Sequence, residues 1–225
     1  MISVIIPCYS RQENLNKVIP AWLKQKGVEY ELIVGFGPDV IVPEHRRIKA
    51  IPLDLPKGKR GALASWNNTL IDASDGDVLL FAHSDMLVRN PNHLAVMLAA
   101  LTPNAMVTSN YIVGDVNVNG SWMQMTMISR ELVLKAGKWD ERYDEGAGWE
   151  DADFLTRLGK AGAYYEQVVQ DFDKAPSHLP HKSCREEEWF MDAYIHNKTL
   201  YNNTHGAGIL WNMEQGELNG KPFKR

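Results

Sequence analysis

Three polar residues close an apolar stretch in the segment "DVLLFAHSDML", which runs from Asp77 to Leu87. The run VLLFA is typical of a buried strand, and His83, Ser84 and Asp85 follow it directly. A carboxylate with an imidazole two residues away suits a divalent metal that takes oxygen and nitrogen ligands, such as Mn²⁺. A polar turn in which Asp85 caps the next segment explains the same residues, and the stretch alone favours that turn.

A second stretch, "GWEDADF", gathers acidic side chains at the predicted start of a helix. Glu150, Asp151 and Asp153 would complement the positive end of the helix dipole there, and this alone is a structural reason for the acidic cluster. Carboxylates this close together also raise one another's pKa, which suits a general base. The indole of Trp149 beside them is a natural platform for the apolar face of a sugar.

Two histidines, His178 and His181, stand in "SHLPHK" on either side of a Leu-Pro pair. Pro180 disfavours helical backbone at Leu179, so the two histidines belong to a loop. Loop histidines are often simply solvated, and no cysteine pair stands nearby to complete a zinc site. They become candidate metal ligands only if their loop folds over the sheet edge near Asp85.

Basic residues precede a predicted helix in "PKGKRGALASWNN". Lys57, Lys59 and Arg60 lie just before the helix start, where backbone N–H groups and cations together can bind a phosphate. A solvated basic loop accounts for the same pattern at least as well.

The elements that must position these residues alternate between strand and helix. Short apolar runs predict strands at 3–7, 31–37, 48–53, 78–82, 105–110, 121–128 and 163–169, and the alternation in 121–128 indicates one buried face. Helical spacing predicts helices through 15–23, 61–73, 90–101, 129–137 and 151–160, and from about 183 to 196. Capping boxes at Ser10–Glu13 and Ser183–Glu186 mark two of the starts, and Pro20 should kink or divide the first helix. The tail after Asn202 is expected to be loop.

This alternation predicts an α/β fold with a mostly parallel central sheet and helices on both faces, in a single domain. Ligands of such sheets bind beyond the carboxyl ends of the strands. The segments Pro7–Tyr9, Gly35–Gly37 and His83–Asp85 each follow a predicted strand, so they are expected to line one edge.

The composition is that of an ordinary globular chain, with 225 residues, 44% hydrophobic and 23% charged. A net charge of −4 excludes a global basic field, so nucleic acid is not an expected partner. Two cysteines, Cys8 and Cys184, indicate a reduced, cytoplasmic protein. The apolar runs are too short to span a bilayer, and the N-terminus lacks the features of a signal peptide. Peripheral association with a membrane is left open.

The order of these segments resembles that of the inverting, sugar-nucleotide-dependent glycosyltransferases of the GT-A fold, family 2 and its relatives. The similarity lies in "SVIIPCYSRQENL", "KGKRGALASWNNTLIDASDGDVLLFAHSD", "MISRELVLKAGKWDERYDEGAGWEDADFLTRLGKAG" and "HLPH", over about residues 1–200. The resemblance implies a single GT-A domain over 1–225, with a nucleotide-sugar half at about 1–110 and an acceptor and catalytic half at about 111–201. Residues 202–225 form a tail.

The resemblance also implies roles for individual residues. A divalent ion, Mn²⁺ or Mg²⁺, would be bound by Asp85 and by His178 or His181, with His83 as a further candidate ligand. Asp151 would be the general base and Glu150 would place the acceptor. The residues implied in acceptor binding are Trp149, Gly148 and Tyr143, and those implied in nucleotide binding are Pro7, Tyr9, Arg11, Gly37, Arg60 and Ser84.

The implied substrates are a nucleoside-diphosphate sugar, with UDP as the expected nucleotide, and the hydroxyl of a glycan or glycoconjugate. Two positions depart from the family pattern. His83 stands where the first Asp of an Asp-x-Asp triplet is usual, and Gly35 and Gly37 stand where many relatives have an acidic pair. Asp39 is a candidate to replace that pair. The donor sugar, the linkage formed and the oligomeric state are left open.

Two alternatives follow from the same residues. A sugar-nucleotide-binding protein of this fold without turnover is consistent with His83 and the missing acidic pair, although a binder does not need the clustered Glu150 and Asp151. A sugar-1-phosphate nucleotidyltransferase would need a glycine-rich basic loop after the first strand, and "PCYSRQENL" has no glycine. An NAD-type dehydrogenase is not supported, because no G-x-G-x-x-G follows that strand.

Overall fold

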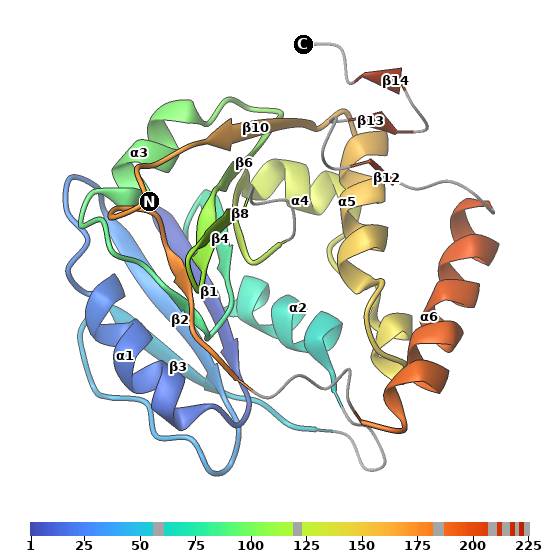
Figure 1. The fold of residues 1–225 in the computed structure, drawn as a ribbon, viewed down its shortest axis with the longest axis horizontal. Coiled ribbons are helices and arrows are strands. Elements are labelled where there is room, and N and C mark those ends of the chain that lie inside the picture. The colour runs from blue at the N-terminus through green and yellow to red at the C-terminus, as the bar shows by residue number, and fades with distance from the viewer. Residues whose placement is uncertain are drawn as a thin grey trace.

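The computed structural model describes residues 1–55, 61–118, 123–181 and 187–206, and the backbone of three short strands beyond them. A seven-stranded sheet with the order β10-β6-β9-β4-β1-β2-β3 forms the centre of the molecule (Figure 1). Its strands are β1 Ile2–Cys8, β2 Tyr30–Phe36, β3 Ile48–Pro52, β4 Val78–Ala82, β6 Ala105–Ser109, β9 Met125–Ser129 and β10 Tyr164–Val168. Neighbouring strands are parallel except at β9, which is antiparallel to both β4 and β6.

Helices cover both faces of this sheet, because alternate strand residues point to opposite sides. Val4 and Ile6 of β1 pack in one apolar cluster with α1 and α3, whereas Ile5 packs in a second cluster with α2, α4 and α5. The helices are α1 Gln12–Trp22, α2 Leu63–Ala73, α3 His93–Ala100, α4 Arg130–Ala136 and α5 Glu150–Lys160. The predicted α/β fold with a mostly parallel sheet and helices on both faces is therefore confirmed.

A second, smaller sheet lies beyond the carboxyl end of β4. It has the order β5-β11-β7-β8, with β5 Met86–Leu87, β11 Ser177–His178, β7 Tyr111–Val113 and β8 Val116–Val118. The sequence did not predict these strands, because two or three residues are too few to show a periodicity. This sheet matters for function because β5 directly follows the His83–Asp85 turn.

The last described helix, α6 Phe190–His205, is longer than the predicted helix, which ended near His196. It continues because Tyr201 and His205, four residues apart on one face, are buried. A 3₁₀ helix, η1 Glu141–Glu145, precedes α5. The predicted Ser183–Glu186 capping box lies outside the described residues. The tail is not all loop, since it contains β12 Trp211–Asn212, β13 Glu217–Leu218 and β14 Lys221–Pro222, which form a three-stranded sheet.

Three local predictions were wrong. The Ser10–Glu13 capping box does not form, because α1 begins after Arg11 with no side-chain cap. Of the two effects predicted for Pro20, the division of α1 does not occur: the residue lies in the last turn of one helix, where the missing N–H costs a single hydrogen bond. Of the strand predicted at 121–128, residues 121–122 lie outside the described residues and the strand β9 begins at Met125. Its residues Met125–Ile128 are all buried, not only those on one face, because both faces of the sheet are covered.

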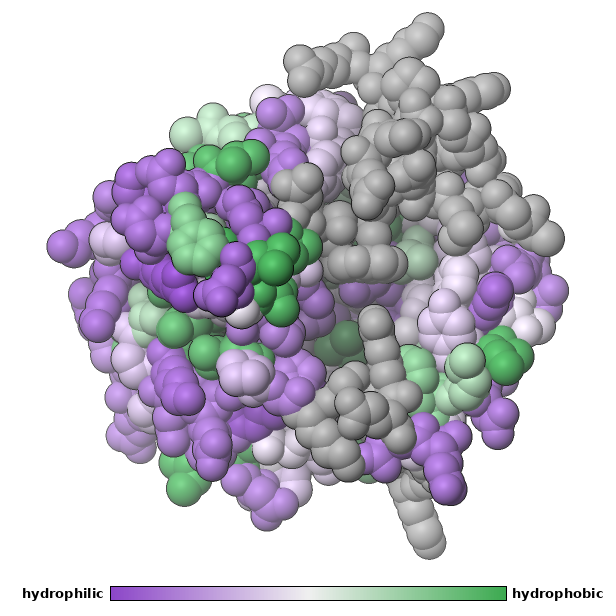
Figure 2. All heavy atoms as spheres, in the orientation of Figure 1, coloured by the Kyte–Doolittle hydropathy of each residue, from purple (hydrophilic) through white to green (hydrophobic). Residues whose placement is uncertain are grey.

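No helix among the described residues is long and apolar enough to cross a membrane. In space-filling form, the face seen in this orientation is mostly hydrophilic, and its apolar residues form separate small groups (Figure 2).

Candidate functional site

Asp85, His178 and His181 come together at the carboxyl end of β4. Met86 of β5 pairs with His178 of β11 in antiparallel register, and Leu179 N donates to Asp85 O at 2.7 Å. His181 Nε2 lies 3.0 Å and His178 Nε2 3.8 Å from Asp85 Oδ2. The candidate ligand atoms of all three residues lie within 4.8 Å of one another. The loop that carries the two histidines therefore does fold over the sheet edge near Asp85.

The chemistry of this cluster fits a divalent cation. Asp85 is 2% exposed, and its Oδ1 has no hydrogen-bond partner among the described residues, which is costly for a buried carboxylate unless a ligand satisfies it. One carboxylate and two imidazoles form the oxygen and nitrogen set that Mn²⁺ and similar ions accept. Desolvation lowers the pKa of His178, which favours the neutral imidazole that binds metal.

A cation from the chain itself also meets Asp85. Arg11, at the start of α1, forms an ion pair with Asp85 Oδ2 through Nη1. Its side chain is 40% exposed, so the guanidinium stands at the surface of the site rather than inside the core. Arg11 therefore combines a contact to the candidate metal ligand with access to a bound anion.

His83 and Ser84 occupy different places in the turn. His83 N donates to Gln124 O at 3.2 Å, and Met86 N donates to His83 O at 3.0 Å, so the His83 backbone closes the turn. The His83 ring is not part of the three-residue cluster, and desolvation lowers its pKa. Ser84 is buried.

The end of β1 carries an aromatic stack. Tyr9 lies parallel to Trp66 of α2, with 5.0 Å between ring centroids and 8° between planes. A side chain at Gly37 would collide with the Tyr9 backbone and come within 2.8 Å of its ring, so this position needs glycine. Close packing thus explains one of the two glycines at the place of the acidic pair. The sequence did not indicate this stack, because Tyr9 and Trp66 lie in different segments of the chain.

Pro7 and Arg60 are two further residues predicted to bind the nucleotide. Pro7 lies at the end of β1 opposite Gly35 of β2, at the expected sheet edge. Arg60 and the lysines before it lie outside the described residues.

The start of α2 already binds an anion of the chain itself. Asp144 accepts hydrogen bonds from Ala64 N and Ser65 N, each at 2.9 Å, and from the Ser65 hydroxyl. These N–H groups belong to the helix start that the sequence had suggested for a phosphate, and in this structure Asp144 accepts their hydrogen bonds. The sequence gives no sign of this contact, because Asp144 lies about 80 residues further along the chain.

The second acidic cluster lies at the start of α5. Gly148 and Trp149 both have left-handed backbone, with φ of 68° and 70°, and Glu150 and Asp151 begin the helix. Burial, with a smaller contribution from Asp144, raises the pKa of Glu150 to about 7. Burial and the adjacent Glu150 carboxylate raise the pKa of Asp151 well above its usual range. Asp151 Oδ1 has no hydrogen-bond partner within the described ranges.

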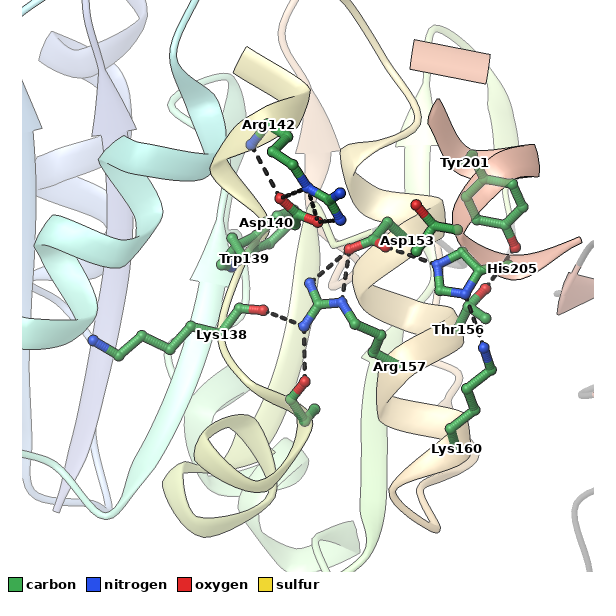
Figure 3. A network of polar contacts seen from close by, with 12 residues as sticks. Lys138, Trp139, Asp140, Arg142, Asp153, Thr156, Arg157, Lys160, Tyr201 and His205 are labelled. Atoms are coloured by element: carbon green, nitrogen blue, oxygen red, sulfur yellow. Dashed lines mark hydrogen bonds and ion pairs between the residues drawn. The ribbon is translucent and has the colours of Figure 1, made fainter. Parts of the chain in front are cut away.

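Asp153, the third carboxylate of "GWEDADF", belongs to a separate buried network (Figure 3). Its Oδ2 lies 2.6 Å from Arg157 Nη2, and its Oδ1 accepts from His205 Nε2 at 2.8 Å. The other ring nitrogen of His205 lies 2.9 Å from Lys160 Nζ. Because both Asp153 oxygens are paired, this residue joins α5 to α6 and is not available to a substrate.

Two aromatic rings of α6 pack against Trp149. Its indole lies 5.7 Å from the Tyr194 ring and 5.1 Å from the Tyr201 ring, between centroids. Tyr143, a predicted acceptor residue, is 2% exposed, so its ring supports the site from inside and does not line it in this structure. Burial raises the pKa of the Tyr143 hydroxyl.

The sequence model of glycosyl transferase family 2 matches residues 3–169. The chain belongs to this family, and its fold is of the GT-A type. No curated protein matches the sequence.

Several solved structures share the fold at low identity. Staphylococcus aureus TarS 1-349 in complex with UDP-GlcNAc is 14% identical, with a TM-score of 0.63, over 90% of this chain and 65% of that one. The catalytic domain of Drosophila beta1,4-galactosyltransferase 7 in complex with xylobiose is 17% identical, with a TM-score of 0.60, over 89% and 79%. A mutant of that enzyme in complex with manganese, UDP-Gal and xylobiose is 18% identical, with a TM-score of 0.57, over 82% and 73%. The chain spans 39 to 65% of the length of the TarS chains.

Proposed function

We propose that this protein is a divalent-metal-dependent, inverting glycosyltransferase. It moves a sugar from a nucleoside-diphosphate sugar, with UDP as the expected nucleotide, to a hydroxyl of a saccharide or glycoconjugate. The observation that carries the proposal is the convergence of Asp85, His178 and His181 at the carboxyl end of β4 in a family 2 chain.

The geometry of the sheet edge supports a common site for donor and acceptor. A helix between parallel strands runs against them, so α2 begins at the carboxyl edge of the sheet. Asp144 binds that helix start and lies six residues before Glu150. The acidic cluster is thereby tied to the edge that carries Tyr9 and Asp85. The complexes of the related structures with UDP-GlcNAc, or with manganese, UDP-Gal and xylobiose, favour the same substrate classes.

The donor side uses residues from several separate segments of the chain. Asp85, His178 and His181 would hold the ion, and a bound divalent ion offsets the charge of a diphosphate leaving group. Arg11 stands beside Asp85 with a partly exposed guanidinium, which suits pairing with the diphosphate. Tyr9 offers an aromatic ring to the nucleobase, and Pro7, Gly37, Ser84 and Arg60 are the remaining proposed nucleotide residues.

The acceptor side uses the start of α5. Asp151 takes the proton of the acceptor hydroxyl, and Glu150 places that hydroxyl in line with the anomeric carbon. The new glycosidic bond forms as the bond to the diphosphate breaks on the opposite face, which inverts the configuration. Trp149 presents its indole to the acceptor sugar, and the positive φ of Gly148 turns the chain towards that position.

The test is a transfer assay with UDP- and GDP-sugars and Mn²⁺ over a broad acceptor panel. Asp151→Asn should lower kcat by about 10²- to 10⁴-fold, because it removes the base. Asp115→Asn, at an exposed turn, is the matched control and should transfer like the wild type. UDP binding without transfer or donor hydrolysis would contradict the enzyme and favour a sugar-nucleotide-binding protein.

The division into a nucleotide-sugar half at 1–110 and an acceptor half at 111–201 is part of this proposal. So is a cytoplasmic location, with peripheral association where the acceptor is lipid-linked.

A further inference from the structure

Asn197 lies in the middle of α6 with 0% of its surface exposed, outside the 3–169 segment that matches the family. Its Nδ2 donates to Tyr143 O at 2.8 Å and to Gly148 O at 2.7 Å. These two carbonyls stand near the two ends of the loop 143–149, whose first three residues belong to η1 and which leads into α5. One side-chain amide from α6 therefore closes this loop.

An asparagine side chain suits these two hydrogen bonds. A neutral amide nitrogen carries two hydrogens, so it can satisfy two carbonyls at once. The Asn197 Oδ1 has no hydrogen-bond partner in the part of the chain that the structure describes, although an unpaired buried acceptor costs free energy. An apolar side chain would fill the same space without the cost of this unpaired oxygen. The two hydrogen bonds that Asn197 Nδ2 donates are therefore what the asparagine contributes at this position.

The loop also rests directly on the α6 backbone. Ala147 N donates to Ala193 O at 3.2 Å. A side chain at Gly146 would lie 2.5 Å from Ala193 O and would collide with Asn197 as well. Glycine at this position is what lets the loop approach α6 closely enough for the amide to reach both carbonyls.

The loop needs such support, because it ends in two left-handed residues. The φ values are 68° at Gly148 and 70° at Trp149, and the second is unfavourable for any residue with a side chain. On its other side the loop is held by Asp144, which binds the start of α2. The residues that follow Trp149 at once are Glu150 and Asp151.

We propose that Asn197 is a positioning residue that fixes the loop 143–149 and thereby sets Glu150 and Asp151 for proton abstraction. The inference rests on the proposed function for its catalytic consequence. It assigns a role to α6, which supplies no group to the reaction itself.

The test replaces Asn197 with Leu, which has a similar size and no donors, and with Ser, which keeps one donor. Asn203→Leu, at an exposed position of the same helix, is the matched control. Asn197→Leu should lower kcat on the order of 100-fold, the effect of misplacing a catalytic group by about 1 Å. Asn197→Ser should show a smaller loss. The KM for the UDP-sugar should not change, because the donor residues are untouched.

Two further readouts separate positioning from simple stability. The pH at which kcat rises should move lower in Asn197→Leu, because a loosened loop exposes the proposed base Asp151, and Glu150 beside it, to water. Amide hydrogen exchange in residues 143–149 should increase in Asn197→Leu and Asn197→Ser but not in Asn203→Leu. A lower melting temperature with unchanged kcat, pH profile and exchange would overturn the proposal.

Hydrogen exchange also keeps the two proposals apart. If the wild type transfers no sugar, the proposed function fails. Faster amide hydrogen exchange in residues 143–149 of the Asn197 variants would then still support the role of Asn197 in fixing the loop. If the wild type is active and both variants equal it in kcat and pH profile, the positioning role fails and the enzyme stands.

Discussion

At the scale of single residues, hydrogen-bond saturation distinguishes the carboxylates that can bind a ligand from those that cannot. Both oxygens of Asp153 are paired, with Arg157 and His205. Asp85 and Asp151 each keep one buried oxygen without a hydrogen-bond partner among the described residues. The sequence could not make this distinction, because His205 lies 52 residues from Asp153. It identified the acidic stretch by spacing, but not which of its members serve chemistry and which serve structure.

The raised pKa of Glu150 has a consequence for stability. Its ordinary pKa is 4.5, and burial raises it to about 7 in the folded protein. The folded state therefore binds the proton more tightly than the unfolded state, and stability is lost as the pH rises from about 4.5 to 7. Glu150→Gln removes this loss, so it should be more stable than the wild type above pH 7, by up to about 3 kcal/mol, and similar to it below the ordinary pKa.

Thermal melting from pH 4 to 8 measures this difference without any substrate. Glu188→Gln, at an exposed position of the chain, should follow the wild type at every pH. A Glu150→Gln variant whose melting temperature changed with pH in parallel with the wild type would show that Glu150 is not desolvated.

At the scale of elements, long periodic segments could be predicted and short ones could not. The apolar runs of β1, β2 and β4 and the helical spacing through 129–137 are local signals, and they agree with the structure. The β5–β11 pair has two residues in each strand and forms only because distant segments meet. Yet it is this pair that brings His178 to Asp85. The site depends on contacts that local patterns cannot encode.

The Asp153 network should hold α5 and α6 together as one unit. Asp153→Ala leaves the Arg157 guanidinium, which is 20% exposed, without its carboxylate, and such a loss costs about 3–5 kcal/mol. Urea unfolding measures this cost. The control is Asp171→Ala, which breaks the exposed Asp171–Lys174 pair and should leave the unfolding curve unchanged. Equal curves for both variants would mean that the network does not stabilise the packing of α6 on α5.

At the scale of the whole molecule, the α/β fold explains why the candidate site residues lie close together. Parallel strands deliver Tyr9, Gly37 and Asp85 to one edge, as the strand and helix alternation predicted. The structure also accounts for the departures from the family pattern. Gly37 is required by its contact with Tyr9, and the His83 ring is not in the three-residue cluster, although two histidines from a distant loop are. The proposed metal site therefore consists of one carboxylate and two imidazoles.

The most direct test is a crystal structure with Mn²⁺ and UDP, with manganese located from its anomalous signal. We expect one Mn²⁺ peak within coordination distance of Asp85, His178 and His181. The UDP diphosphate should lie beside this peak, and the uracil ring should lie near Tyr9. The same experiment on Asp85→Asn should show neither peak nor ordered diphosphate. Mn²⁺ bound elsewhere, or UDP bound in the same pose without any metal, would contradict the account.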